Sequence, residues 1–328
     1  MRVLVTGGAG YIGSQTAKAL AQAGHEPVVL DDLSTGRRAA VKWGPFIEGN
    51  LGDKDLLEKI FKDYGFEAVL HFAACLLVGE SMTNPHKYFW NNVVGTLVLL
   101  DTMKAFEVKP IVFSSSAATY GNPEKAPIPE DHPKRPVNPY GESKLAMERA
   151  IHWYGVAYGL RGVALRYFNA AGADLEGDLG EEHDPESHLV PLVVQAALGQ
   201  RPSVEIYGTD YPTPDGTAIR DFIHVVDLAD AHVRALDYLV AGGGSTELNL
   251  GTGQGHSVRE VVSSAGKLCN GRVPAEDGPR RAGDPAVLVA DPGKAQQLLG
   301  WHPQYSDLDT IIQSAWKWHS SKGKSRRA

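Results

Sequence analysis

Two side chains with complementary acid–base chemistry, Tyr140 and Lys144, are four residues apart in a stretch with helical spacing. Residues at this spacing share one face of a helix and can interact. A free phenol, with a pKa of about 10, is a poor base at neutral pH, but a neighbouring ammonium favours the phenolate. Tyr140 could therefore take a proton from a substrate hydroxyl while the carbon that bears this hydroxyl gives up a hydride.

A run of hydroxyl side chains, Ser114-Ser-Ser116, follows an apolar segment that predicts a buried strand at 110–114. Ligands of parallel sheets bind at the carboxyl ends of strands, so Ser116 is placed to donate a hydrogen bond to the reacting oxygen. A serine-rich turn that satisfies its own backbone is the alternative interpretation. A Tyr-x-x-x-Lys spacing is frequent by chance, but its position after a glycine turn and a strand-end serine favours one reaction centre.

The glycine turn is Gly7-Gly-Ala-Gly10-Tyr-Ile-Gly13, between a predicted buried strand at 3–5 and a predicted helix at 14–23. Glycines let the backbone approach a pyrophosphate, whose charge then meets the N–H groups of the helix start. The order of strand, glycine turn and helix therefore predicts dinucleotide binding. An ordinary glycine-rich turn is the alternative for such a pattern taken alone.

An acidic residue, Asp31, follows the second predicted strand at 26–30. It stands about 20 residues beyond the glycines, where a carboxylate binds the adenosine ribose hydroxyls. A carboxylate there repels a 2′-phosphate, which favours NAD over NADP. Arg37 and Arg38 lie a little downstream and keep NADP as the alternative.

Strands and helices alternate as far as residue 168, which predicts an α/β fold with a Rossmann-type doubly wound parallel sheet. Beyond residue 169 a loop, a helix and several short strands predict a smaller mixed α/β substrate-binding cap. We expect a dinucleotide-binding domain over 1–168 and a substrate domain over 169–328, from which segments such as 222–250 return to the first. The predicted ranges are, for strands, 46–50, 68–74, 162–167, 204–207, 222–226, 247–250 and 287–290, and, for helices, 54–64, 85–106, 139–158, 189–198 and 227–239.

The composition argues against several functional classes. A net charge of −7 over 328 residues argues against a general nucleic-acid binder. No apolar stretch approaches the roughly 20 residues that span a bilayer. Two cysteines, Cys75 and Cys269, are far apart and lack metal-ligand spacing. We therefore expect a cytoplasmic protein that binds no nucleic acid, membrane or metal.

Longer motifs extend these patterns over nearly the whole chain, from Val3 to about Trp318. Besides the stretches already quoted, they are His71-Phe-Ala-Ala74, Val78-Gly-Glu-Ser81, Asn91-Asn-Val93, Leu165-Arg-Tyr-Phe-Asn169, Gly208-Thr-Asp-Tyr-Pro212, Asp215-Gly-Thr217, Arg220-Asp-Phe-Ile-His-Val-Val226 and Arg281-Ala-Gly-Asp284. In these motifs the chain resembles the extended short-chain dehydrogenase/reductase family and, within it, the UDP-glucose 4-epimerases.

The resemblance implies a tightly held NAD that is reduced and reoxidised within one turnover. Tyr140, assisted by Lys144 and Ser116, would remove the proton of the sugar 4-hydroxyl as hydride leaves C4. The 4-keto sugar would then turn over and accept the hydride on its other face, interconverting UDP-glucose and UDP-galactose. Relatives dimerise through the two long helices, 85–106 and 139–158, so a homodimer is expected.

The resemblance also assigns the contacts. The expected cofactor contacts are Gly7, Gly10, Tyr11, Ile12, Gly13, Asp31, Asp32, Asn50, Leu51, Phe72, Ala73, Ala74, Asn92, Ser114, Tyr140, Lys144 and Tyr167. The expected UDP-sugar contacts are Ser116, Asn169, Leu189, Tyr207, Arg220, Arg281, Asp284 and Leu288. Among them, Arg220 and Arg281 would bind the diphosphate, and Leu288 would limit sugar size and disfavour N-acetylated hexosamines.

Three positions depart from the family pattern. Leu76 stands where several members carry a lysine, Asn50 replaces an aspartate that contacts adenine, and Gln15 replaces a histidine. Individual cofactor contacts are therefore expected to differ, while the fold and the catalytic group stay the same.

Other functions stay open beside epimerisation of the hexoses. UDP-xylose/UDP-L-arabinose 4-epimerases use the same machinery, because C6 takes no part in it. A sugar-nucleotide 4,6-dehydratase usually carries Asp-Glu after the strand-end hydroxyl, where this chain has Ala117-Ala118. A reductase would need exchange of its cofactor, and a non-catalytic dinucleotide sensor would have little use for the serine, tyrosine and lysine together.

Overall fold

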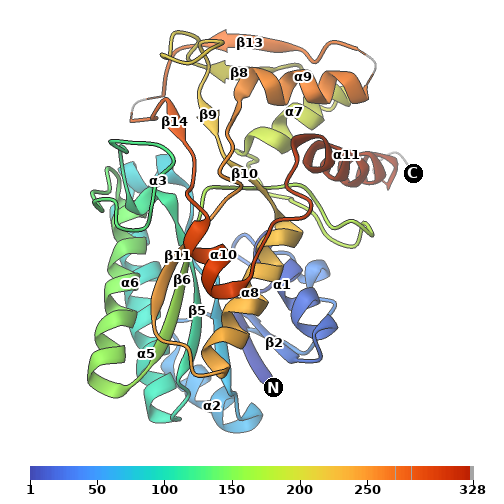
Figure 1. The fold of residues 1–328 in the computed structure, drawn as a ribbon. Helices are drawn as coiled ribbons and strands as arrows, with labels where there is room; N and C mark the ends of the chain where they lie inside the picture. Colours follow the sequence, from blue (N-terminus) through green and yellow to red (C-terminus); the bar gives the residue numbers. More distant parts are fainter. Residues whose placement is uncertain (270, 282, 326–328) are drawn as a thin grey trace.

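The computed structural model describes residues 1–269, 271–281 and 283–325, and within these ranges its main sheet has seven parallel strands (Figure 1). Their order is β11-β6-β5-β4-β1-β2-β3. The strands are β1 (Arg2–Thr6), β2 (Glu26–Asp31), β3 (Phe46–Glu48), β4 (Ala68–His71), β5 (Pro110–Ser116), β6 (Arg161–Tyr167) and β11 (Thr246–Leu250). The predicted doubly wound Rossmann-type sheet is confirmed.

Helices cover both faces of this sheet, which explains why long apolar runs such as 3–5 and 28–30 are buried within its strands. One face carries α1 (Tyr11–Gln22), α8 (Val225–Val240) and α10 (Gly293–Leu299), and the other carries α2 (Lys54–Tyr64), α5 (Gly95–Ala105) and α6 (Pro139–Tyr158). Successive side chains of a strand point to opposite faces. Val3 and Val5 accordingly belong to the core under α1 and α8, and Leu4 belongs to the core under α2 and α5.

The strand order reverses at β1 and β4, and the crevice at such a switch point is where doubly wound sheets bind ligands. The glycine turn leaves β1 there. The segment after β4 runs beside it and leads into α3 (Val78–Thr83), a helix that the sequence did not predict.

The predicted helix 85–106 is interrupted. It consists of α4 (Pro85–Tyr88), a π-helical stretch η2 (Phe89–Val94) and α5. π-helical turns leave one extra residue per turn and occur often at functional sites. Here the extra residue allows Asn92 to turn inward, where its amide donates to Ser143 Oγ at 2.9 Å and its Oδ1 accepts from the Cys75 backbone at 2.7 Å.

A smaller mixed α/β cap lies beyond the carboxyl ends of the strands, at the top of Figure 1. Its helices are α7 (Leu189–Ala197), α9 (Val258–Leu268) and α11 (Leu308–Ser325), which share an apolar core. Its short strands are β7 (Asn169–Ala171), β8 (Val204–Tyr207), β9 (Ile219–Arg220), β10 (Phe222–His224), β12 (His256–Ser257), β13 (Ala275–Gly278) and β14 (Val287–Leu288). The chain reaches the cap through β7, returns to the main sheet with α8 and β11, and crosses to the cap again at α9.

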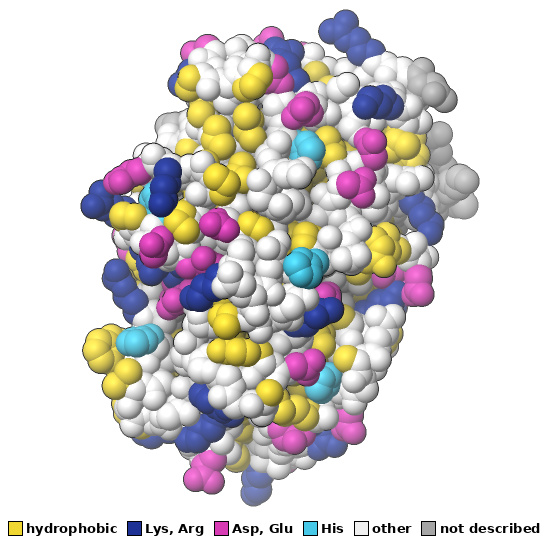
Figure 2. Space-filling model, in the orientation of Figure 1, with side chains coloured by type: hydrophobic (Ala, Val, Ile, Leu, Met, Phe, Trp, Pro, Cys, Tyr) yellow, Lys and Arg dark blue, Asp and Glu magenta, His cyan; other side chains and the backbone are white. Residues whose placement is uncertain are grey.

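The face drawn in Figure 2 carries Lys and Arg interspersed with Asp and Glu. This distribution agrees with the modest net charge of the chain. Within the described ranges, none of the helices combines the length and the apolar character needed to cross a membrane.

Candidate active site

A cavity of about 1710 Å³ extends from the glycine turn across the carboxyl ends of the strands to the cap. All of the predicted cofactor and substrate contacts line it, with the exception of Asn92. Asn92 is buried behind the lining, where it holds the backbone at Cys75 and the hydroxyl of Ser143. Asn92 therefore shapes the cavity wall, and its contact with the cofactor stays a prediction.

The glycine turn is shaped for close approach of a ligand. Gly7 has a φ of +70°, and a Cβ there would lie 2.6 Å from the backbone nitrogen of Ala73, so any side chain would collide with the segment after β4. A Cβ on Gly13 would lie 2.3 Å from the carbonyl oxygen of Gly7. The turn thus presents bare backbone at the N-terminus of α1, where partial positive charge favours a pyrophosphate.

Asp31 fastens the end of β2 to this turn. One carboxylate oxygen accepts from the Ala9 backbone at 3.0 Å, and the other accepts from the Leu33 backbone at 2.8 Å. Burial raises the pKa of Asp31, and these two hydrogen bonds oppose the rise. Asp31 and Asp32 both line the cavity, and Asp32 also accepts from the Asn50 amide at 2.9 Å. Turn and carboxylates together form a seat that fits a dinucleotide.

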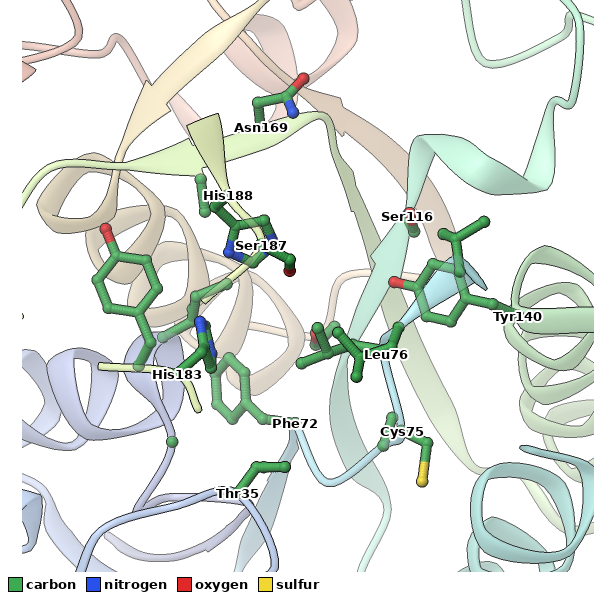
Figure 3. Close-up of a pocket in the computed structure, with 18 of the residues that line it drawn as sticks. Thr35, Phe72, Cys75, Leu76, Ser116, Tyr140, Asn169, His183, Ser187 and His188 are labelled. Carbon is green, nitrogen blue, oxygen red and sulfur yellow. The ribbon is translucent and has the colours of Figure 1, made fainter. Parts of the chain in front are cut away.

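The first turns of α6 bring Tyr140 and Lys144 to the cavity. The Asn138 side chain accepts from the Gly141 backbone at 2.8 Å and so begins the helix, and Pro139 occupies its first turn. Gly141 packs against the segment after β5, where a Cβ would lie 2.5 Å from the Ala118 carbonyl oxygen. This tight contact places Tyr140 beside Ser116, as Figure 3 shows.

The electrostatics of this group are those of a buried acid–base pair. Burial lowers the pKa of Lys144 to about 7, and Glu148 opposes this shift. The Lys144 Nζ donates to the Ser114 carbonyl oxygen at 2.8 Å and lies 5.9 Å from the centre of the Tyr140 ring. Burial raises the pKa of Tyr140, and a hydrogen bond with Ser116 lowers it. Positive charge beside the phenol would lower that pKa further.

A buried polar network supports this group from behind, and the sequence did not reveal it. Ser115 Oγ donates to Glu148 at 2.5 Å, and Arg166 forms an ion pair with Glu148 at 2.6 Å. Arg166 also donates to the Tyr120 hydroxyl at 3.0 Å. The network ties β5, β6 and α6 together, so the strand end that carries Ser116 and the helix that carries Lys144 are held in one register.

On the cap side, four predicted substrate contacts form two pairs. The Arg281 guanidinium lies 3.9 Å from the centre of the Tyr207 ring. Arg220 makes an ion pair with Asp284. These side chains bring two cations and one aromatic face to the cavity wall, the combination that binds a diphosphate and stacks on a base.

Comparison with known proteins identifies the family to which this chain belongs. Residues 3–251 match the model of the NAD dependent epimerase/dehydratase family. The chain belongs to this family. It is 52% identical over 322 residues to the UDP-glucose 4-epimerase of Lacticaseibacillus casei, covering 98% of this chain and 97% of that protein. It is also 52% identical to the UDP-glucose 4-epimerase of Halalkalibacterium halodurans, covering 97% of this chain and 96% of that protein.

Solved structures agree with this assignment. UDP-glucose 4-epimerase from Brucella ovis in complex with NAD superposes with a TM-score of 0.94 at 54% identity, covering 96% of this chain and 97% of that one. A UDP-glucose 4-epimerase from Stenotrophomonas maltophila, with bound NAD and formylated UDP-arabinopyranose, superposes with a TM-score of 0.96 at 40% identity, covering 99% of each chain. The resemblance inferred from sequence is confirmed, and NAD is the cofactor of this family member.

The segment between β7 and α7 contributes cavity residues that the sequence did not assign, among them His183, Ser187 and His188. Figure 3 shows the two histidines on the side of the cavity opposite Ser116 and Tyr140. Only one signal pointed to them, the position of 187–188 directly before the helix that begins at the predicted contact Leu189.

The same segment is fastened to α1. Lys18 is buried in α1, and its Nζ lies 2.9 Å from Asp174, 2.5 Å from Glu176 and 3.0 Å from Asp178. The Tyr11 hydroxyl donates to the Gly172 carbonyl oxygen at 2.6 Å. The ion pair between Lys18 and the buried Asp174, together with the hydrogen bond of Tyr11, thus holds this wall of the cavity against the helix that follows the glycine turn.

Proposed function

We propose that this chain interconverts UDP-glucose and UDP-galactose by epimerisation at C4 of the sugar, through a transient 4-keto sugar. One observation carries the proposal: Ser116, Tyr140 and Lys144 share one cavity with the glycine turn of a dinucleotide seat. The family members that match over nearly the whole chain are UDP-glucose 4-epimerases. Such a protein is an isomerase, because NAD leaves each turnover in the state in which it entered.

Three side chains perform the proton chemistry. NAD, when bound, supplies the acceptor for the C4 hydride and returns that hydride to the opposite face of the sugar. Tyr140 takes the proton of the 4-hydroxyl and gives it back at the end of the turnover. The ammonium of Lys144 stabilises the phenolate, and Ser116 donates a hydrogen bond to the oxygen at C4.

The cap binds the nucleotide. Arg220 and Arg281 bind the two phosphates, with bidentate guanidinium contacts. The Tyr207 ring packs on the uracil, and Asp284 accepts from the uridine ribose. Asn169, Leu189 and Leu288 surround the sugar. In this assignment residues 1–168 form the NAD-binding domain and 169–328 mainly the UDP-sugar-binding domain, with 222–250 completing the first.

The working unit is a homodimer in the cytoplasm. Large apolar side chains are exposed on the two long helical segments, among them Phe89, Trp90, Trp153 and Val156, with Trp90, Trp153 and Val156 each exposed by more than 60%. These segments pack against each other, so a second copy could cover both. The free thiols of Cys75 and Cys269 suit a reducing compartment.

The test is a side-by-side assay of the purified chain with UDP-galactose and UDP-L-arabinose. Turnover of UDP-galactose without added NAD supports the proposal, and turnover of the pentose alone contradicts it. The pentose arm is motivated by the 40% identical structure that contains formylated UDP-arabinopyranose.

A variant pair tests the mechanism. Tyr140→Phe should retain NAD through gel filtration and lose at least about 100-fold in kcat, as expected for removal of a general acid–base group. Tyr64→Phe, at a partly buried tyrosine outside the cavity, is the matched control and should keep full activity. Near-normal turnover by Tyr140→Phe would refute the assigned role.

A further inference from the structure

Four potential metal ligands, Glu181, His183, Glu186 and His188, gather in the segment before α7. Each offers one nitrogen or carboxylate oxygen, and these four atoms all lie within 4.8 Å of one another. His183 Nδ1 lies 3.1 Å from Glu181 and 3.7 Å from Glu186, while His188 Nδ1 lies 3.8 Å from Glu186 and contacts Glu181. Ligands about 2.0–2.1 Å from a tetrahedral zinc ion stand about 3.3 Å apart, so most of these separations need little adjustment.

The cluster also holds buried polar atoms without a hydrogen-bond partner. Among the described residues, these atoms include Oε2 of Glu181, Oε2 of Glu186 and Nδ1 of His183. Glu181 is only 2% exposed, so water does not compensate its free oxygen. His183 Nδ1 approaches Glu181 closely but without the direction of a hydrogen bond. Two atoms that are close yet not aimed at each other are arranged like two ligands of one ion.

We propose that Glu181, His183, Glu186 and His188 form a binding site for a divalent transition metal, with Zn²⁺ as the best match. Imidazole nitrogens and carboxylate oxygens are ligands that zinc accepts in a tetrahedral site. Because the protein fills all four positions, the site is of the structural kind. The ion fixes residues 181–188, which form the cavity wall opposite Ser116 and Tyr140 (Figure 3).

This proposal changes the expectation of no metal, which rested on the two cysteines alone. Histidine and glutamate ligands at 181, 183, 186 and 188 fall in a segment whose spacing predicts only a loop. Solvent reaches the site from the cavity side, since the His188 side chain is 42% exposed. An ion therefore has an entry path as well as a set of ligands.

The second acidic cluster of this segment provides the contrast. Asp174, Glu176 and Asp178 also offer converging oxygens, but the Lys18 ammonium already stands among them. A resident cation satisfies these carboxylates and excludes a second one. This cluster is therefore expected to bind no metal, although it lies on the same stretch of chain.

The test uses the NAD-containing protein after treatment with a chelator, titrated with Zn²⁺ and separately with Co²⁺. The ion must displace a proton, so the titration is run at mildly alkaline pH. We expect one Zn²⁺ per chain, a higher melting temperature, and the visible absorption of tetrahedral Co²⁺ without a thiolate charge-transfer band.

Variants identify the ligands. His183→Gln and His188→Gln should each weaken Zn²⁺ binding by more than about 100-fold, because even the outer partners of metal ligands contribute 10- to 100-fold. Glu176→Gln, in the cluster filled by Lys18, is the matched control and should bind as the parent does. Two histidine variants are used so that the test still holds if one of them misfolds. Retention of NAD shows that a given variant is folded. Absence of stoichiometric binding, a thiolate band, or unchanged affinity in both histidine variants would overturn the site.

Discussion

Replacement of Lys144 by methionine should abolish turnover and at the same time stabilise the protein. The ammonium of Lys144 is buried, and its pKa falls from about 10.4 in an unfolded chain to about 7. A tenfold change in the protonation equilibrium corresponds to about 1.4 kcal/mol, and the folded side chain is half protonated at pH 7, so its lowered pKa costs about 4 kcal/mol of folding free energy at that pH. Lys144 is only 3% exposed, and solvent screening removes little of this cost.

The substitution also removes a hydrogen bond, and this loss opposes the gain in stability. Methionine cannot donate to the Ser114 carbonyl oxygen, which Lys144 contacts at 2.8 Å, and an orphaned buried acceptor costs about 1–3 kcal/mol. The net gain is therefore about 2 kcal/mol at pH 7. For a chain of this length, with an unfolding entropy of about 2.1 cal/mol/K per residue, the melting temperature should rise by about 3 °C.

The pH dependence tests the cause. A lysine with a lowered folded pKa destabilises fully below about pH 7, and its effect vanishes as pH rises toward the unfolded pKa of about 10.4. The advantage of Lys144→Met should thus shrink between these limits. Melting curves of parent and variant, recorded across this pH range at matched NAD occupancy, measure the difference in stability. A variant that is less stable than the parent at neutral pH, or a gap that does not change with pH, would refute the reasoning.

A second buried lysine, Lys18, is the control, because its pKa shift and its effect on stability have the opposite sign to those of Lys144. Lys18 is 4% exposed, and although burial lowers its pKa, the hydrogen bonds to three carboxylates together raise it above the ordinary value. Its stabilising effect is complete at neutral pH and is lost only at strongly alkaline pH. Lys18→Met should therefore destabilise by about 3 kcal/mol, because Asp174 would stay buried without a counter-charge.

Three further predictions concern the cavity and its support. Gly7→Ala should lose NAD on gel filtration, because the new Cβ would collide with the backbone at Ala73; a variant that keeps NAD would contradict the close approach of these two segments. Arg166→Met should lower the free energy of unfolding by about 3–5 kcal/mol in denaturant titrations, since Glu148 is left charged and buried, and adding Glu148→Leu should recover part of the loss. Leu288→Ala should raise kcat/KM for UDP-N-acetylglucosamine relative to UDP-glucose, and comparable turnover of both sugars by the parent would show that Leu288 does not limit sugar size.

Much of the fold was predictable because its signals are local. The N-cap residue Asn138 and the first-turn residue Pro139 specify where α6 begins. Apolar runs such as 3–5 and 110–114 specify strands that are buried on both faces. The π-helical stretch at 89–94 was missed, because its backbone pattern leaves the apolar spacing of a helix nearly unchanged.

The reaction centre was predictable because its residues occur in recognisable motifs. The buried polar network behind it was not predictable, because Ser115, Glu148 and Arg166 come from three elements and meet only in the folded chain. The histidines at 183 and 188 were missed for a related reason: in an irregular segment, spacing does not tell which side chains converge.

The contact between Gly7 and Ala73 has a consequence for assembly of the protein. The two residues come from the turns after β1 and β4, and they lie so close that a Cβ on Gly7 would stand 2.6 Å from the Ala73 nitrogen. Neither turn alone makes the dinucleotide seat, so the seat exists only when β1 and β4 are already paired. NAD therefore binds the assembled sheet and not its separate parts, and a ligand of the native state alone deepens the native minimum. The NAD that is recycled in the reaction therefore also stabilises the folded protein.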